Sequence, residues 1–371
     1  MRSDYITPVL SGLANFQGLA QQWYLDKTLT WPAQPAVNKI DVHHHMVPDF
    51  YAQAIEEAGG DPSGWHVPKW SASSSRLMMK HLGIQSSILS VTAPGPMIIP
   101  DSASQIALAR RLNTHAAQLR DDDHAAFGFF ASLPDILLHQ GAALSEISYA
   151  FDNLSADGVT LFTRYGPNAT YLGNPALDAI WAELDRRAAT VFVHPTHPAA
   201  GDMVNPYLPQ PLVDYPHETT RAAVDMITRG TLRRYPNVKV ILSHAGGTLP
   251  YIMDRFLTLS RRRPGMVQSL MGGGAATYEE AREAFGRFYY DVALSTAPGV
   301  LRLLVESVGA GQVVYGSDFP YAQPSAYPAF LEELEKFDFA PSTRDQVNFA
   351  NAQKLFGRFG KHVDVAEPKS E

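Results

Sequence analysis

The chain has 371 residues, of which 45% are hydrophobic and 18% are charged, a composition typical of a globular protein that can bury a large core. Its formal net charge of -7 argues against a nucleic acid or an anionic membrane as partner, because both attract clustered Lys and Arg. The sequence contains no cysteine, which excludes disulfides, thiol nucleophiles and thiolate-ligated metals. Any metal ion must therefore be bound by His, Asp or Glu.

Residues 1–37 are predicted to form an N-terminal extension. A partly helical pattern covers residues 12–24, and the proline-marked stretch WPAQPAV closes the extension. The extension lacks the basic start and continuous apolar run of a secretion signal, and no apolar run of about eighteen residues occurs in the chain. We therefore expect a soluble, cytoplasmic protein with no membrane partner.

Eight apolar, β-branched runs follow and predict eight strands. Amphipathic stretches with helical spacing, such as residues 102–119 and 175–189, lie between them. The runs occupy residues 37–45, 86–93, 127–134, 157–165, 190–196, 238–246, 288–295 and 313–320. This alternation predicts an α/β fold, a (β/α)8 TIM barrel, over residues 38–358, with an inserted loop after the first strand and a C-terminal tail at 359–371.

A doubly wound open sheet is the alternative fold. It would usually carry a glycine-rich phosphate-binding turn after an early strand, and the sequence contains neither G-x-G-x-x-G nor a P-loop. The glycine-rich stretch GGGAATYEEA, residues 272–281, does not follow a predicted strand, and we interpret it as a loop. We expect no organic cofactor.

The first predicted strand ends in three consecutive histidines, in the stretch KIDVHHHMVP. Because side chains alternate along a strand, His43 and His45 should face one side and His44 the other. A histidine pair of this kind supplies two ligands, and a zinc-like ion needs about four. The remaining ligands must come from other strands.

Polar residues also end three later strands of the predicted barrel. His194 follows the fifth strand, His244 the sixth and Asp318 the eighth. The active sites of such barrels lie at the carboxyl ends of the strands, so these side chains should meet the histidine pair at one mouth. A single histidine at a strand end is more often a hydrogen-bonded structural residue, but five such groups at one face favour a metal site.

The lysine distribution bears on the number of metal ions. Two-metal barrels can use a carbamylated lysine from a middle strand as a bridge, and no lysine occurs between Lys80 and Lys239. We therefore expect one divalent ion per chain, zinc best by ligand type, with manganese or iron also compatible. His244 remains as an unligated acid or base beside the metal. The predicted ligands are His43, His45, His194 and Asp318.

Four motifs of the chain resemble those of a known family. KIDVHHH, FVHPT, ILSHAGGTLPY and VVYGSDFPYA are similar to the motifs of the aminocarboxymuconate-semialdehyde decarboxylase group of the amidohydrolase superfamily, over about residues 38–358. AGGDPSGW, ILSVTAPG and SHAGGTLPYIMDR most resemble its 6-methylsalicylate decarboxylases. The resemblance implies metal-dependent, non-oxidative loss of CO2 from an aromatic or dienic carboxylate, with 6-methylsalicylate, a substrate of polyketide metabolism, as the best match.

The resemblance also implies roles for individual residues. It implies that the four predicted ligands, His43, His45, His194 and Asp318, bind the metal and that His244 acts as general acid or base. It places Arg255 across a homodimer interface, binding substrate carboxylate in the neighbouring subunit. Tyr321 matches a position where the family often has a phenylalanine that stacks on the substrate, and the family arginine after the first strand has only Arg76 as a nearby candidate.

Three aromatic residues are candidates for accepting a methyl group beside the carboxylate. They are Trp65, Trp70 and Phe162, which lie on long loops or at strand ends, and plain packing in the core or in a lid is the alternative for each. The substrate partner would thus be a small aromatic carboxylate.

The chemistry of decarboxylation requires an acid above the ring. Direct loss of CO2 would leave an aryl carbanion, so the ring carbon must be protonated first, and Asp318 and His244 are both candidates for the acid. A metal hydrolase of an amide or lactone, with His244 as base, is the alternative function, and a non-catalytic binding barrel is a second. Product mass distinguishes the decarboxylase from the hydrolase, because decarboxylation removes one CO2 and hydrolysis adds one water.

Overall fold

The eight predicted strands form one parallel sheet. The structure is a computed structural model that describes residues 38–168, 170–198, 203–262 and 277–359. In it, the strand order is β1-β2-β3-β4-β7-β8-β9-β10, and neighbouring strands run parallel. The strands of the sheet are β1 (Lys39–His45), β2 (Ile84–Ser90), β3 (Phe127–Ala131), β4 (Gly158–Phe162), β7 (Thr190–His194), β8 (Lys239–Leu242), β9 (Tyr289–Asp291) and β10 (Val313–Val314).

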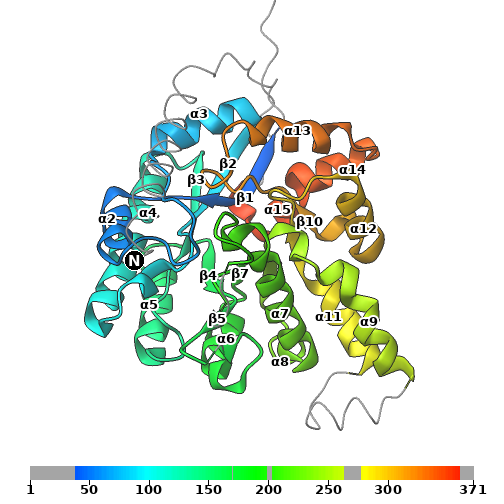
Figure 1. Cartoon of the computed structure of the whole chain (residues 1–371), viewed down its shortest axis with the longest axis horizontal. Coiled ribbons are helices and arrows are strands. Elements are labelled where there is room, and N and C mark those ends of the chain that lie inside the picture. Colours follow the sequence, from blue (N-terminus) through cyan, green and yellow to red (C-terminus); the bar gives the residue numbers. More distant parts are fainter. Residues whose placement is uncertain (1–37, 169, 199–202, 263–276, 360–371) are drawn as a thin grey trace, which may run out of the picture.

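The sheet closes into a barrel between β1 and the segment that follows β10. His44 forms a parallel bridge with Phe319, and the backbone N–H of Val42 donates to the carbonyl of Tyr315 at 3.0 Å. Helices surround the strands on the outside (Figure 1). The predicted (β/α)8 barrel is confirmed, and a short hairpin of β5 (Arg164–Tyr165) and β6 (Thr170–Tyr171) is added after β4.

The helices complete the alternation that the sequence predicts. Their apolar faces pack on the outside of the sheet in one large cluster, while a second cluster fills the barrel interior. They are α2 (Asp49–Glu57), α3 (Ala72–Leu82), α4 (Ser102–Asp122), α5 (Gln140–Asp152), α6 (Asp178–Arg186), α7 (Asp214–Thr228), α8 (Thr231–Arg234), α9 (Leu249–Arg262), α11 (Tyr278–Arg287), α12 (Pro298–Val308), α13 (Ala326–Lys336), α14 (Pro341–Asp345) and α15 (Asn351–Leu355).

Two sequence expectations need correction or qualification. The loop interpretation of residues 272–281 is wrong from Tyr278 onward, because Thr277 and Glu280 form a capping box that starts α11; residues 272–276 lie outside the described residues. The insertion after the first strand contains the helix α2 as well as the loop of residues 58–71. The extension 1–37 and tail residues 360–371 also lie outside the described residues.

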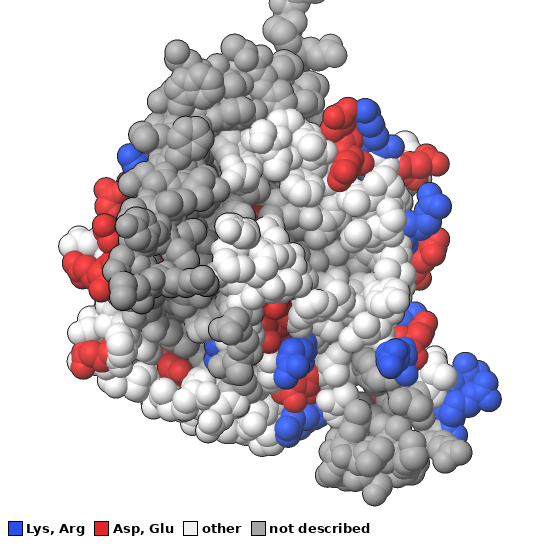
Figure 2. Space-filling view, in the orientation of Figure 1, with Lys and Arg blue, Asp and Glu red and all other residues white. Residues whose placement is uncertain are grey.

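One face of the molecule shows charged side chains of both signs (Figure 2). On the face drawn in Figure 2, the described Lys, Arg, Asp and Glu side chains lie mainly around the edge, with acidic and basic groups side by side, and the middle of the face is largely uncharged. None of the helices in the described part of the chain is long and apolar enough to span a membrane.

Candidate active site

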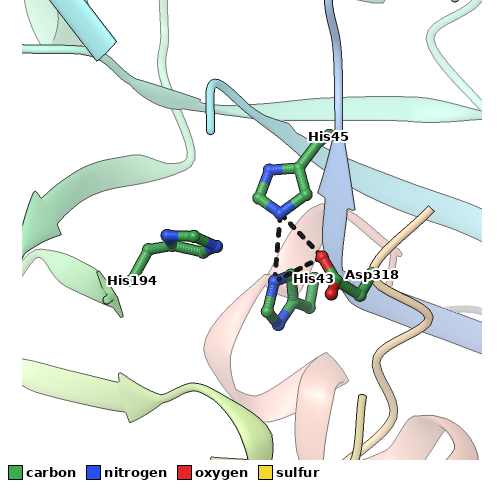
Figure 3. A group of neighbouring side chains, drawn as sticks. All are labelled: His43, His45, His194 and Asp318. Atoms are coloured by element: carbon green, nitrogen blue, oxygen red, sulfur yellow. Dashed lines mark hydrogen bonds and ion pairs between the residues drawn. The ribbon is translucent and has the colours of Figure 1, made fainter. Parts of the chain in front are cut away.

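The structure brings the four predicted metal ligands together at the carboxyl ends of the strands. His43 and His45 project from the end of β1, His194 from the end of β7, and Asp318 from the loop after β10 (Figure 3). One ligand atom from each lies within 4.8 Å of those of the others, and all four residues are buried. The Nε2 atoms of His43 and His45 are 3.1 Å apart, and Asp318 Oδ1 lies 3.2 and 3.0 Å from them.

Local backbone geometry sets the direction of the β1 histidines. The pairing of β1 with β2 shifts register between Asp41 and His44, as at a bulge. His44 turns away from the cluster, with Nδ1 2.9 Å from Asp41 Oδ2 and Nε2 2.9 Å from Ser75 Oγ. As alternation predicts, His44 is a hydrogen-bonded residue outside the cluster.

A second set of groups orients the three clustered histidines. In each ring, Nδ1 is held by an oxygen outside the cluster, so Nε2 is left facing the other ligands. This arrangement fixes the tautomer that a metal ion requires. The Nδ1 contacts join His43 to Asp291 Oδ2 (2.9 Å), His45 to Ser90 Oγ (2.9 Å) and His194 to the carbonyl of Pro195 (2.7 Å).

The electrostatics of the cluster favour a positive charge at its centre. Burial alone would lower the pKa of His43, but the carboxylates of Asp291 and Asp318 outweigh it and raise that pKa to about 10. Burial raises the pKa of Asp318, yet His43 beside it holds the value well below the usual range. Burial lowers the pKa of His45 to about 4. A divalent ion would supply the charge that His43 otherwise carries.

The donor set fits a divalent metal ion. Three imidazole nitrogens and one carboxylate oxygen are the ligand types of catalytic zinc, with room for water or substrate. The 3.1 Å between the two β1 nitrogens is close to the ~3.3 Å between two ligands of a tetrahedral ion with bonds of ~2.0–2.1 Å. The same donors are compatible with manganese.

His244 lies beside the cluster on the turn after β8. Its backbone N–H donates to Asp291 Oδ1 at 3.0 Å, and its Nδ1 donates to the carbonyl of Ala293 at 3.0 Å. Its φ of 55° is in the left-handed region, which non-glycine residues rarely adopt, and Asp318 has a similar φ of 60°. The following Gly247 is required, because a Cβ there would lie 1.9 Å from the carbonyl of Pro216.

A cavity of about 340 Å³ opens above the cluster. His194, His244 and Asp318 contribute to its wall, together with Trp65 from the loop of residues 58–71 and Tyr321 from the segment after β10. The ring of Tyr321 lies 5.3 Å from that of His45, centroid to centroid. Most of the remaining wall is apolar, as an aromatic ligand would require.

The other predicted substrate-binding residues do not line this cavity in the described part of the chain. Trp70 donates its Nε1 hydrogen to Ser75 Oγ at 2.8 Å, and the buried Phe162 has its ring 6.3 Å from that of His194, centroid to centroid. Arg76 lies on α3 and pairs with Asp123 at 2.8 Å. Arg255 is exposed on α9.

Sequence reasoning missed three polar residues of the site. Asp291 was visible as a lone carboxylate in the apolar run FYYDVALS, and Ser90 as a polar residue within the predicted strand of residues 86–93. Asp61, which lines the cavity, stands in the stretch AGGDPSGW between Gly60 and Pro62. For the first two, the available signal was a polar residue near the carboxyl end of a barrel strand.

Fold and site together define a parallel α/β barrel with a histidine–aspartate cluster at the carboxyl ends of its strands. The family model described as Amidohydrolase matches residues 40–358, and the chain belongs to this family.

Relatives of nearly full length are decarboxylases. A 6-methylsalicylic acid decarboxylase from Penicillium expansum is 48% identical over 329 residues, covering 89% of this chain and 99% of that protein. One from Aspergillus aculeatus is 47% identical over 335 residues, covering 89% and 99%. These similarities confirm the family resemblance expected from the motifs.

A solved structure supports the fold. The dihydroxybenzoic acid decarboxylase from Polaromonas sp., with bound manganese and the inhibitor 2-nitroresorcinol, matches with a TM-score of 0.72 at 20% identity. The match covers 89% of this chain and 99% of that one.

Proposed function

We propose that the protein is a carboxy-lyase that converts 6-methylsalicylate to 3-methylphenol and CO2 without an oxidant. The observation that carries the proposal is its similarity, at 48% and 47% identity over nearly the full length, to two 6-methylsalicylic acid decarboxylases. The site is compatible with this reaction, because a cluster suited to a divalent ion lies beneath a largely apolar cavity. We place the enzyme in the cytoplasm and in polyketide metabolism.

We propose His43, His45, His194 and Asp318 as the ligands of one divalent ion, with zinc the best match and manganese also suitable. When bound, the ion would supply positive charge for the carboxylate and the ortho oxygen of the substrate. No organic cofactor is needed.

Proton transfer is the work of the chain's own residues. A proton must reach the ring carbon that bears the carboxylate; the bond to the carboxylate carbon then breaks, and its electron pair restores the aromatic ring. His244, with Nδ1 bound to the carbonyl of Ala293, presents Nε2 as the free ring nitrogen, and it lines the cavity together with Asp318. Either group can deliver the proton. The apolar wall keeps water away from the ring.

The direct test is an assay of the metal-loaded protein with 6-methylsalicylate. We expect CO2 release and a product lighter than the substrate by one CO2, with slower or no turnover of salicylate and dihydroxybenzoates. Protein treated with a chelator is the control and should be inactive until metal is restored. A product heavier by one water from an amide or lactone substrate, with no CO2 release from any aromatic acid, would favour the hydrolase alternative.

We further propose that the enzyme acts as a homodimer in which Arg255 binds substrate carboxylate in the partner's site. Arg255 is exposed on α9 and is not among the residues that line the cavity of its own chain, and Tyr251, one helical turn earlier, is 80% exposed. Residues four apart share a helix face, so an apolar ring and a cation would enter the contact together.

Mixing two inactive variants tests the shared site. Heterodimers of Arg255→Ala and His244→Asn should recover up to about half of the activity of the wild-type dimer. In the heterodimer one of the two sites has both Arg255 and His244, and the other site has neither. Arg302→Ala, which removes an exposed arginine on α12 beside α9, is the control and should stay active alone. Verified heterodimers without recovery would contradict a shared site.

A further inference from the structure

We propose that Asp61 excludes substrates with a second acidic group on the ring, so that the cavity accepts aromatic acids with a single carboxylate. The inference rests on the proposed function, because it takes an aromatic acid as the ligand. It adds a specificity-determining residue at the part of the wall formed by the loop of residues 58–71.

The backbone holds Asp61 in place. The residue follows Gly59 and Gly60, whose φ values of 96° and 103° are conformations that other residues rarely adopt. Its Oδ1 accepts a hydrogen bond from the backbone N–H of Ser63 at 2.8 Å. The carbonyl of Ser63 in turn accepts from the backbone N–H of Gln210 at 3.1 Å, which ties this loop to the segment before α7. The carboxylate is thus fixed rather than free to swing into solvent.

Two tyrosines of the cavity wall lie beside the metal cluster. The ring of Tyr321 lies 5.3 Å from His45, and the ring of Tyr215 lies 6.2 Å from His194. Both tyrosines line the same cavity as Asp61 and Asp318, so the two carboxylates share one enclosed space with these rings. A ring bound at the cluster would therefore occupy the cavity that Asp61 lines.

No Lys or Arg of the same chain is among the described residues that line the cavity, so no basic side chain of this chain accompanies Asp61 there. Burial raises the pKa of the Asp61 carboxyl, while hydrogen bonds from the backbone and side chain of Ser63 act in the opposite direction. In its ionised form the carboxylate only accepts hydrogen bonds, so it tolerates a neutral ring edge or a hydroxyl donor and repels another carboxylate. In a partly buried site this repulsion is much stronger than in water.

Binding to the metal-loaded protein tests the proposal without requiring turnover. Calorimetry would compare salicylate with 2-hydroxyterephthalate and 4-hydroxyisophthalate, which are salicylate with a second carboxylate at two ring positions. The wild type should bind salicylate more tightly than both diacids. The ratio measured is the Kd of a diacid divided by the Kd of salicylate. Asp61→Asn, which keeps an acceptor for Ser63, should lower this ratio by roughly ten- to thirtyfold, mainly through tighter binding of a diacid.

Matched variants complete the experiment. Asp61→Ser should narrow the ratio in the same way, and melting temperatures would verify that both variants fold. Asp49→Asn, which removes an exposed carboxylate on α2, should leave the ratio unchanged. An unchanged ratio in both Asp61 variants, or a wild type that binds the diacids as tightly as salicylate, would overturn the proposal. Failure of the wild type to bind salicylate or to turn over 6-methylsalicylate would instead overturn the proposed function.

Discussion

His194→Ala should strip the metal ion from the protein and abolish decarboxylation. His194 comes from β7 and faces the other three ligands from a separate strand (Figure 3). Its Nδ1 is bound to the carbonyl of Pro195, so its Nε2 is already directed at the cluster. Loss of an outer partner of a metal ligand typically costs ~10–100-fold in metal affinity or activity, and loss of the ligand itself should cost more.

Elemental analysis would give the metal content of the variant, and the rate of CO2 release would give its activity. His197→Ala is the matched control, because His197 lies three residues further along the same segment and is not part of the ligand cluster. The control should keep its metal and most of its activity. Full metal occupancy and normal turnover in His194→Ala would show that this ligand assignment is wrong.

The convergence of the ligands was predictable because a barrel leaves little freedom. Alternation within β1 placed His43 and His45 on one face, and the parallel order of strands placed His194 and Asp318 at the same end. Neither inference needed the details of packing. The strand ends were less accurate, because the turn with His244 in a left-handed conformation ends β8 at Leu242, before the predicted limit.

The outer partners and the cavity wall depended on tertiary packing. Whether Asp291 faces the histidines depends on the register of β9 against its neighbours, which the sequence pattern does not state. Trp70 is hydrogen-bonded to Ser75 and Phe162 packs against His194, and neither ring is among the described residues that line the cavity. The position of Asp61 follows from the conformation of two glycines in a loop, for which periodicity carries no signal.

His244→Asn should keep its metal while losing turnover, because His244 is a candidate acid and not one of the four proposed metal ligands. The four-residue ligand cluster is complete without His244. Asparagine can still donate a hydrogen bond toward the carbonyl of Ala293, but it cannot exchange a proton at the position of Nε2. We expect turnover to fall ~100-fold or more, the usual scale for loss of a general acid or base.

Metal content and the rate of 6-methylsalicylate decarboxylation would be measured across pH, with His217→Asn, an exposed histidine of α7, as the control that should behave as wild type. Loss of metal from His244→Asn would mean that His244 is itself a ligand. This outcome is tested because the ring of His244 lies 4.8 Å from that of His43, centroid to centroid, and His43, His244 and Asp291 could themselves hold a metal ion. Retention of both metal and rate would assign the proton to Asp318. Retention of metal with loss of rate would leave His244 as the group that delivers the proton, with Asp318 acting as a ligand.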